Sequence, residues 1–389
     1  MAAALNGITV LDLTSYLAGP YGCALLGDVG AKIIKIEAPG GDAMRTYPST
    51  IAEECRAFVG ANRNKRSIVI NLKVSEGRQA FYDMVKRADV VVHNFRPGVP
   101  KALGIDYETL KMHKLDLIYC GLTGFGETGP LAKHPGYDQM LQCFSGIAWF
   151  QGEERGSPEV LRGSIVDFYS SALIAFGISA ALVRRERTGE GASVDLSLLR
   201  SAIALQPGRF VWTEREGRDV KREPAMGRIS GAFPTKEGFL YLQASTPRFW
   251  SALCEILGKP ELAQDPRFDT VRKRFDRADE IMPQICAALL EKPALVWEEL
   301  MIGQVPCVAV REIEDMFDHP QVQDQRLVEE HDHPLIGRYR SMSTALTMDG
   351  VSIPTSRAPM LGEHSDEILK EFGFSEEIVS TLRACGALG

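Results

Sequence analysis

The sequence lacks several features that mark specialised classes of protein. Its eight cysteines form no CxxC pair and no Asn-x-Ser/Thr acceptor occurs, so we expect reduced thiols in a cytoplasmic protein. No basic segment followed by an apolar run opens the chain, and hence no signal peptide is predicted. The apolar run after Asp167, residues 168–183, contains serines and is predicted to be too short to span a membrane.

Positive charge is also in short supply. Lysine and arginine number 44 against 51 aspartates and glutamates, and the net charge of −7 argues against a general nucleic-acid-binding protein. It does not exclude a local basic pocket for a phosphorylated cofactor. The apolar fraction of 45% and the charged fraction of 24% are ordinary for a globular protein, and 389 residues are enough for two or more cores.

Strand and helix patterns alternate through the N-terminal half. Strands are predicted at residues 8–13, 32–37, 67–72, 88–93 and 115–120, and helices at residues 21–26 and 77–87. The first strand, a loop at residues 14–20, a helix and the second strand make a βαβ unit. The alternation predicts an α/β fold with a parallel, doubly wound sheet, in which ligands bind at the carboxyl ends of the strands.

A glycine motif at residues 124–129 fits the G-x-G-x-x-G pattern of dinucleotide sites and follows a strand. Residues 130–136 then include two prolines and a further glycine. They predict a loop where the motif requires a helix whose N-terminus would hold a pyrophosphate. We therefore interpret these glycines as a turn and expect no nicotinamide cofactor.

Asp167 is the only charged residue between Arg162 and Arg184. The apolar residues after it predict a helix that is buried all round, and Asp167 would lie at its start. Two interpretations are open. Asp167 is the N-cap of this helix, or it is a carboxylate nucleophile that the helix N–H groups and dipole hold ionised in a dry site. One residue could also serve both roles.

The second half of the chain predicts a smaller α/β domain. A strand at residues 192–196 and a helix from about Ser197 precede an irregular, charged linker. Further strands are predicted at residues 239–243 and 305–310, and helices at residues 246–257, 274–290, 293–300 and 366–372. We divide the chain into a large domain (1–205), a linker (206–224), a small domain (225–325) and a return linker with a C-terminal segment that docks on the large domain (326–389).

His331 and His333 precede a predicted hairpin at residues 335–346. Two loop histidines could suggest a metal pair, but no further ligands have suitable spacing. We expect no bound metal.

Several short motifs together resemble the class III CoA-transferase family, of the formyl-CoA transferase and carnitine CoA-transferase type. They occur in order from about residue 5 to the C-terminus: residues 10–14 with 18–20, 27–37, 62–67 with 71–73, 94–98, 136–138, the segment that ends at Asp167, and 361–364. The resemblance implies a large Rossmann-like domain built from both chain ends and a smaller α/β domain. It also implies two ring-like subunits interlocked as a homodimer.

A mechanism comes with the resemblance. In this family an aspartate attacks an acyl-CoA thioester to give an anhydride, CoA then forms a thioester with the aspartate, and the acceptor acid takes the CoA through a second anhydride. The matching position is Asp167, so the expected activity is CoA transfer, with acyl-CoA as a substrate and no permanently bound cofactor. In this family a glycine-rich loop of the small domain donates hydrogen bonds to the oxyanion of the tetrahedral intermediates. The nearest match here is residues 227–231, which contain fewer glycines.

The family's CoA contacts carry over to ten positions. They are Leu17, Ala18, Leu72, Lys73, Asn94, Phe95, Arg96, Lys101, Tyr137 and Asp138. Cationic side chains can neutralise phosphate charge, and arginine can stack on adenine. Without the resemblance, Lys73 and Arg96 are equally typical of solvated charges and Tyr137 of a core aromatic. Ala38 and Ala102 stand where some relatives have arginine, so the adenosine end is the least defined part.

Residues for the acyl group are predicted from their chemistry. Arg45, His134 and Arg228 are candidate partners for a second substrate carboxylate, and Tyr16, Trp149 and Phe150 are candidates to line an acyl site. We expect succinyl-CoA or another dicarboxylyl-CoA as donor, and a branched or unsaturated dicarboxylic acid as acceptor.

Three alternative functions stay open. An α-methylacyl-CoA racemase shares the fold and uses an aspartate with a histidine as an acid–base pair; His134 lies 33 residues before Asp167, although Pro135 follows it directly, unlike in racemases. An intramolecular CoA transferase is the second alternative. A CoA-binding regulator without catalytic activity is the third, and it would leave the candidate nucleophile unexplained.

Overall fold

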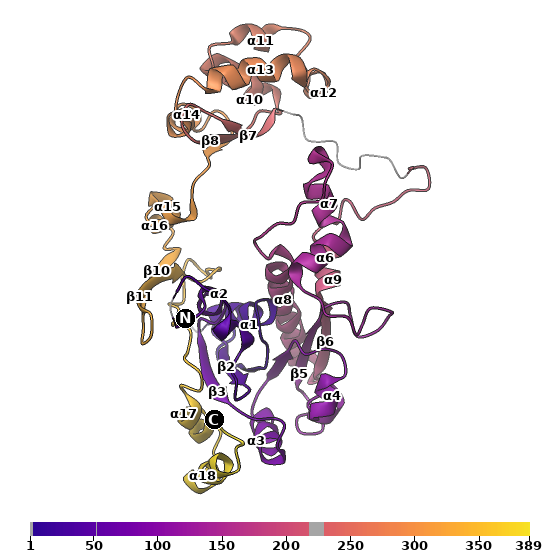
Figure 1. The fold of residues 1–389 in the computed structure, drawn as a ribbon, viewed down its shortest axis with the longest axis vertical. Coiled ribbons are helices and arrows are strands. Elements are labelled where there is room, and N and C mark those ends of the chain that lie inside the picture. Colours follow the sequence, from indigo (N-terminus) through magenta and orange to yellow (C-terminus); the bar gives the residue numbers. More distant parts are fainter. Residues whose placement is uncertain (1–2, 52, 218–228) are drawn as a thin grey trace. The chain divides into compact units, whose positions relative to one another are not determined.

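The computed structural model describes residues 3–51, 53–217 and 229–389. The chain divides into two compact units, one formed by Met1–Phe210 with Gln321–Gly389 and the other by Val211–Pro320. They are called the large unit and the small unit below, and Figure 1 shows the elements of each.

A six-stranded parallel sheet forms the centre of the large unit. Its strands are β1 (Thr9–Asp12), β2 (Lys32–Glu37), β3 (Lys65–Val69), β4 (Val90–His93), β5 (Ile118–Thr123) and β6 (Ala192–Ser197). They lie in the order β3-β2-β1-β4-β5-β6. This is the strand order of doubly wound folds, in which the direction of winding reverses between β1 and β4. The predicted parallel sheet is confirmed, with strand ends displaced by up to three residues.

Helices cover both faces of this sheet. Helices α1 (Ala18–Asp28), α8 (Ile165–Thr188) and α9 (Leu198–Ala204) pack on one face, and α3 (Ser75–Val85), α17 (Ser365–Glu371) and α18 (Glu376–Ala384) pack on the other (Figure 1). Successive residues of β1 point to opposite faces, so Val10 belongs to the first apolar cluster and Leu11 to the second. The strands are therefore buried on both sides, as their apolar composition requires.

Shorter elements complete the large unit. They are η1 (Ala43–Thr46), α2 (Arg56–Ala61), α4 (Val99–Leu103), α5 (Tyr107–Lys111), α6 (Asp138–Ser145), α7 (Ile147–Gln151), η2 (Glu153–Arg155), β10 (Val328–His333) and β11 (Gly337–Met342), with α16 (Pro320–Asp324) at the boundary. Residues 18–20, predicted as loop, are the first turn of α1, because a proline in the first helical turn loses no hydrogen bond.

The predicted place of the hairpin is wrong. Strands β10 and β11 pair antiparallel, with His331 opposite Tyr339 and His333 opposite Gly337. Both histidines therefore lie in the first strand rather than in a preceding loop. Pro334 has no N–H for the ladder, and the chain turns directly after His333.

Helix α8 differs from its prediction in length and burial. Its 24 residues make it long and apolar enough to cross a membrane by length and composition alone, so the expectation that this stretch is too short is wrong. It packs on α1, β5 and β6, and Gly22 permits the approach, because a Cβ there would lie 3.0 Å from Ile174. It is not buried all round, since Phe176 is 72% exposed.

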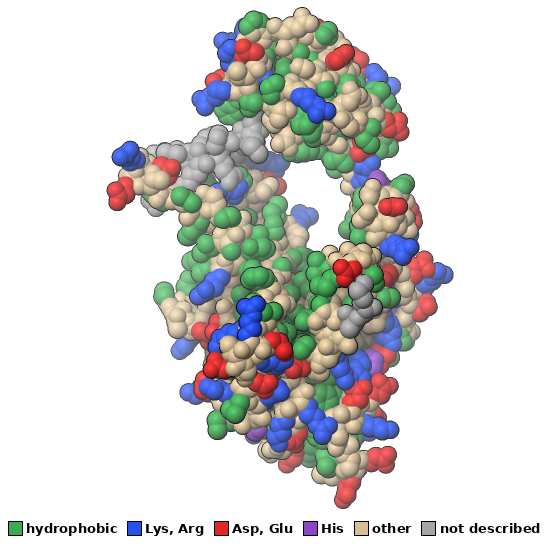
Figure 2. Space-filling model, turned by 180° about the vertical axis from the view of Figure 1, so that it is seen from behind, with side chains coloured by type: hydrophobic (Ala, Val, Ile, Leu, Met, Phe, Trp, Pro, Cys, Tyr) green, Lys and Arg blue, Asp and Glu red, His purple; other side chains and the backbone are tan. Residues whose placement is uncertain are grey.

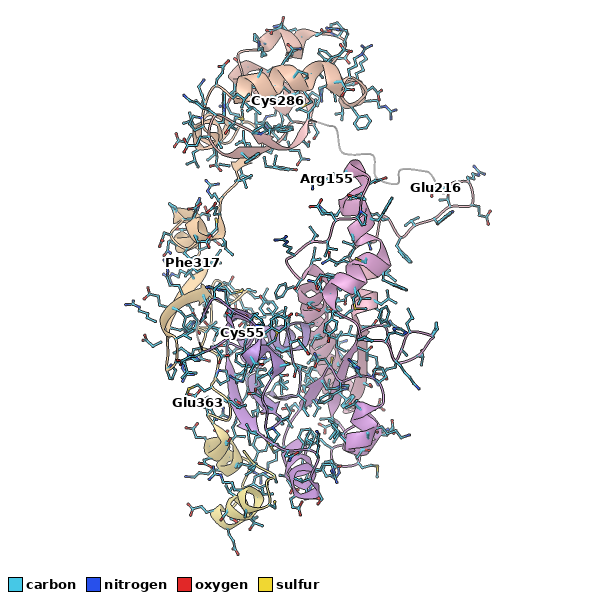
Figure 3. The ribbon with its side chains drawn as sticks, viewed as in Figure 1. Cys55, Arg155, Glu216, Cys286, Phe317 and Glu363 are labelled. Atoms are coloured by element: carbon cyan, nitrogen blue, oxygen red, sulfur yellow. The ribbon has the colours of Figure 1, made fainter. Side chains whose placement is uncertain are left out.

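The small unit has a three-stranded antiparallel sheet and helices. Its elements are β7 (Ser230–Pro234), β8 (Phe239–Gln243), α10 (Pro247–Ile256), α11 (Pro260–Gln264), α12 (Val271–Asp276), α13 (Ala278–Leu289), α14 (Ala294–Met301), β9 (Cys307–Ala309) and α15 (Ile313–Met316). Trp250 and Trp297 lie in its apolar core. The single helix predicted at 274–290 is two helices, because Arg277 leaves the helical conformation at φ −118° and ψ 26°. Figure 3 marks Cys286 in α13 and Cys55 beside α2, and all eight cysteines are free thiols.

Candidate active site

The carboxyl ends of β1, β4 and β5 surround a cavity of about 370 Å³, called here the first cavity. β1 and β4 are the neighbours between which the sheet reverses its winding, which is where doubly wound sheets bind ligands. Nine of the predicted site residues line this cavity: Tyr16, Leu17, Ala18, Asn94, Phe95, Arg96, His134, Tyr137 and Asp167.

A second cavity of about 560 Å³ lies at the carboxyl ends of β2 and β3. Leu72 and Lys73 line it, as do the glycines of residues 40–41. Ser15, Phe95 and Val99 line both cavities. The two cavities are therefore adjacent, with Arg96 in the lining of the first and Lys73 in the lining of the second.

Some predicted residues are not brought to either cavity. They are Arg45, Lys101, Asp138, Trp149 and Phe150. The apolar side chains that line the first cavity include Leu17, Leu122 and Leu198 instead. Arg228 and Gly227, predicted for substrate and oxyanion binding, lie outside the described residues.

Arg45 is occupied within the large unit. Its guanidinium donates to both carboxylate oxygens of Glu37, at 2.8 and 2.9 Å, and to Glu54 at 3.2 Å. It also lies 3.9 Å from the centre of the Phe58 ring. Two carboxylates already pair with this cation and Arg45 lines neither cavity, so its contact with a substrate carboxylate stays a prediction.

Asp167 is the third residue of α8 and not its N-cap. The N-cap is Ser164, whose backbone is left-handed at φ 49° and whose side chain caps nothing. The Asp138 carboxylate takes that role, because it accepts the N–H groups of Val166 at 2.6 Å and of Asp167 at 2.9 Å. The N-cap interpretation of Asp167 is therefore wrong.

Asp138 does not contact the cavity as predicted. It is 2% exposed, and its other oxygen accepts a hydrogen bond from Gln142. The Gln142 amide in turn binds the backbone of Leu161 through both its atoms, each at 2.9 Å. This chain of bonds joins α6 to the segment before α8 and fixes the start of the helix that carries Asp167.

The Asp167 carboxyl group is not held ionised by the helix end. Burial, followed by the negative charge of Asp138, raises the pKa of Asp167 to about 7. The helix N–H groups that could favour its charge are donated to Asp138. A carboxyl group with a pKa close to neutral in a cavity is typical of a functional site.

Polar side chains from other elements fix the loop after β1. The Asn94 amide, predicted as a CoA contact, accepts the Ser15 N–H at 2.9 Å and donates to the Ser15 carbonyl at 2.7 Å. Asp42 accepts the N–H of Tyr16 at 3.1 Å, and Lys35 donates to the carbonyl of Thr14 at 2.9 Å. Three successive residues of the loop are thus each held by a side chain from elsewhere.

Lys35 and Asp42 are functional-site residues that sequence reasoning missed. They form a fully buried ion pair at 2.8 Å, and a second buried pair, Lys65–Asp12, has the same length. The signal was a lysine inside the apolar strand of residues 32–37, since a buried lysine requires a buried partner. The partner could not be chosen from the sequence alone.

Comparison with known proteins places this geometry in a family. The model of CoA-transferase family III matches residues 5–365. An acetyl-CoA:oxalate CoA-transferase of Acetobacter aceti is 35% identical over 95% of this chain and 96% of the relative. A succinyl-CoA:mesaconate CoA-transferase of Haloarcula marismortui is 34% identical over 95% and 96%. The crystal structure of a CAIB/BAIF family protein from Brucella suis superposes with a TM-score of 0.83 at 28% identity, over 96% and 100% of the two chains.

The fold and the cavity-lining carboxyl group define an α/β protein with a candidate site at the carboxyl edge of a doubly wound sheet. The chain belongs to CoA-transferase family III, and it is a class III CoA-transferase. The resemblance stated from the sequence motifs is thereby confirmed.

Proposed function

We propose that the protein moves CoA from succinyl-CoA, or another dicarboxylyl-CoA, to a carboxylic acid acceptor, with Asp167 as the nucleophile. The placement of Asp167 supports this most strongly. Its carboxyl group lines the first cavity, and burial and the charge of Asp138, rather than a hydrogen bond, govern its pKa. No hydrogen bond to this carboxylate comes from the residues that the structure describes, which leaves its lone pairs available for attack.

The proposed chemistry has four steps. An Asp167 oxygen attacks the thioester carbonyl, and the C–S bond breaks. CoA departs as the thiolate, and an acyl-aspartyl anhydride is formed. The thiolate attacks the aspartyl carbonyl, which releases the donor carboxylate and forms an aspartyl-CoA thioester. The acceptor carboxylate attacks that thioester and gives a second anhydride and CoA thiolate. The thiolate then attacks the acceptor carbonyl, which yields the new acyl-CoA and frees Asp167.

Water is the hazard for these intermediates, because it would hydrolyse an anhydride or the aspartyl thioester. Leu17, Leu122 and Leu198 give the first cavity apolar walls. The same burial that excludes water raises the pKa of Asp167, so deprotonation precedes the first attack.

We propose that CoA lies along both cavities. The second cavity, with Lys73, suits the phosphorylated adenosine part, and the first cavity suits the thioester end beside Asp167. Arg96 lines the first cavity with an exposed side chain, where its planar cation can stack on a base or bind phosphate. No permanent cofactor is part of this proposal, since CoA is itself a substrate.

The printed activities of the two relatives support a dicarboxylic substrate, because oxalate and mesaconate are both dicarboxylates. We extend this class to the present chain and leave open which diacid it uses. Transfer between two carboxylates of one molecule would use the same four steps.

We also propose an interlocked homodimer that works in the cytoplasm. Large apolar side chains are exposed on α6, α7 and α8: Met140, Phe144, Trp149, Phe168, Phe176 and Val183. Figure 2 shows hydrophobic side chains gathered on this side of the large unit. An exposed apolar face of this extent is typical of a protein–protein interface.

A trapping experiment tests the proposed function. Incubation with succinyl-CoA followed by hydroxylamine or borohydride should modify Asp167, as mass spectrometry of the peptide would show, and Asp167→Asn should abolish both modification and CoA transfer. Proton exchange at the α-carbon of an acyl-CoA in deuterated water, without a second acid and without a trapped aspartate, would instead establish the racemase that His134 in the same cavity allows. If neither reaction is observed, the protein would be a CoA-binding regulator without catalytic activity.

A further inference from the structure

The backbone of Tyr16 adopts a conformation that its residue type disfavours. Its φ is +69°, in the left-handed region, where a bulky side chain is strained. Neither neighbour of Tyr16 is a glycine, so the local sequence does not favour a left-handed backbone here. A strained backbone persists only where surrounding contacts impose it, so the contacts around Tyr16 indicate what the strain achieves.

Polar side chains on two other loops impose the conformation. Asp42 accepts the N–H of Tyr16, and the fully buried Lys35 holds Asp42 in place. Asn94 binds the preceding residue, Ser15, through two hydrogen bonds. Desolvating an ion pair is expensive, so a buried pair that contacts this loop fixes its shape rather than merely adding stability.

Core packing does not explain where the Tyr16 side chain lies. The residue is 40% exposed, and its ring meets that of Tyr137 edge-on at 6.0 Å between ring centres, where Tyr137 is itself 47% exposed. Both rings line the first cavity together with Asp167. The strained loop thus delivers a phenol to the site instead of to the core.

We propose that the Tyr16 hydroxyl donates a hydrogen bond to the second carboxylate of a dicarboxylic substrate and that Tyr16 therefore determines acid specificity. The inference rests on the proposed function, because it names the substrate class of the same cavity. Arg45, in contrast, lines neither cavity, and Glu37 and Glu54 accept hydrogen bonds from its guanidinium. Burial and the neighbouring Tyr137 phenol raise the pKa of Tyr16, so its hydroxyl stays a donor throughout the neutral range.

Tyr16→Phe tests this, because it removes only the hydroxyl and keeps the ring. The donor is succinyl-CoA, and the acceptors are glutarate and mesaconate, with pentanoate and butanoate as monocarboxylates for comparison. A hydrogen bond to a charged group predicts a loss of about 10- to 100-fold in kcat/KM for the diacids and a change within about twofold for the monoacids. Tyr107→Phe is the matched control, since that half-buried phenol in α5 lines neither cavity, and it should change nothing.

The outcomes separate the two proposals. Equal losses for both acid classes, no loss for diacids, or a wild-type enzyme that prefers monoacids would overturn the role of Tyr16 and leave CoA transfer intact. Failure of the wild-type protein to transfer CoA to any acid would overturn the proposed function itself. A thermal unfolding midpoint of Tyr16→Phe equal to that of the wild type excludes a folding defect as the cause.

Discussion

The Asp138 carboxylate lies 2.9 Å from the backbone nitrogen of Asp167, so that one buried acid caps the helix on which the other acid stands. The same bond that positions Asp167 also brings a negative charge close to it, and that charge contributes to its raised pKa. The position and the acidity of Asp167, the proposed nucleophile, are therefore coupled through one side chain.

The first prediction concerns pH. Asp167 must lose its proton to attack, and its pKa of about 7 means that kcat/KM should rise with pH through the neutral range and level off above it. Asp138→Asn removes the negative charge, lowers the pKa of Asp167 and should move this profile to lower pH. Asp106→Asn, which alters the cap of α5 away from both cavities, is the control and should leave the profile in place. A shift in the opposite direction would contradict the coupling.

The second prediction concerns stability. Unfolding returns the pKa of Asp167 from about 7 to its ordinary value near 3.8, so the unfolded chain releases a proton that the folded chain retains. The resulting loss of stability grows as the pH rises from about 4 to about 7 and is complete above that range. Asp167→Asn should therefore raise the free energy of unfolding at pH 8, by up to about 4 kcal/mol. Urea titrations of both proteins at pH 8 and pH 4 measure this difference in the free energy of unfolding, and the difference should vanish at pH 4.

The third prediction concerns the buried pair of Lys35 and Asp42. Lys35→Met leaves the Asp42 carboxylate without its cation, and such a change typically costs about 3–5 kcal/mol. Lys35→Met with Asp42→Asn should lose less than the sum of the single variants, because no unpaired charge remains. Urea unfolding of the four proteins gives the coupling energy. Strictly additive losses would show that the pair does not act as a unit.

The fourth prediction concerns CoA. Lys73→Ala and Arg96→Ala should each raise KM for the acyl-CoA several-fold with little change in kcat, because ionic contacts to CoA phosphate, unlike contacts to the reacting carbonyl, bind ground state and transition state alike. The wild-type KM should rise with salt, and more steeply than that of Lys73→Ala. Lys86→Ala provides a control, since this exposed lysine pairs with Asp83 outside both cavities. A fall in kcat alone would place these cations at the reacting centre instead.

The fifth prediction concerns assembly. Phe176 is 72% exposed on the otherwise apolar helix α8, and a charge there would be desolvated in an interface. Phe176→Glu should therefore shift the protein from dimer to monomer in sedimentation experiments. Glu186→Gln, at the charged end of the same helix, is the control and should stay dimeric. A wild-type monomer would remove the basis of this proposal.

The sequence by itself determined the sheet and the nucleophile candidate. Alternating strand and helix patterns predict a parallel sheet because burial on both faces leaves a local imprint in each strand. The isolation of Asp167 in an apolar stretch is equally visible, and the order of the motifs identified the family.

Only the tertiary structure decided which polar side chains pair with one another. Asp138 caps α8, Glu37 and Glu54 occupy Arg45, and Asp42 fixes Tyr16, each through partners that lie on different secondary elements. Such choices depend on distances between separate elements, and the sequence contains many carboxylates that could fill each place. The raised pKa of Asp167 has the same origin, since burial and a neighbouring charge exist only once the chain has folded.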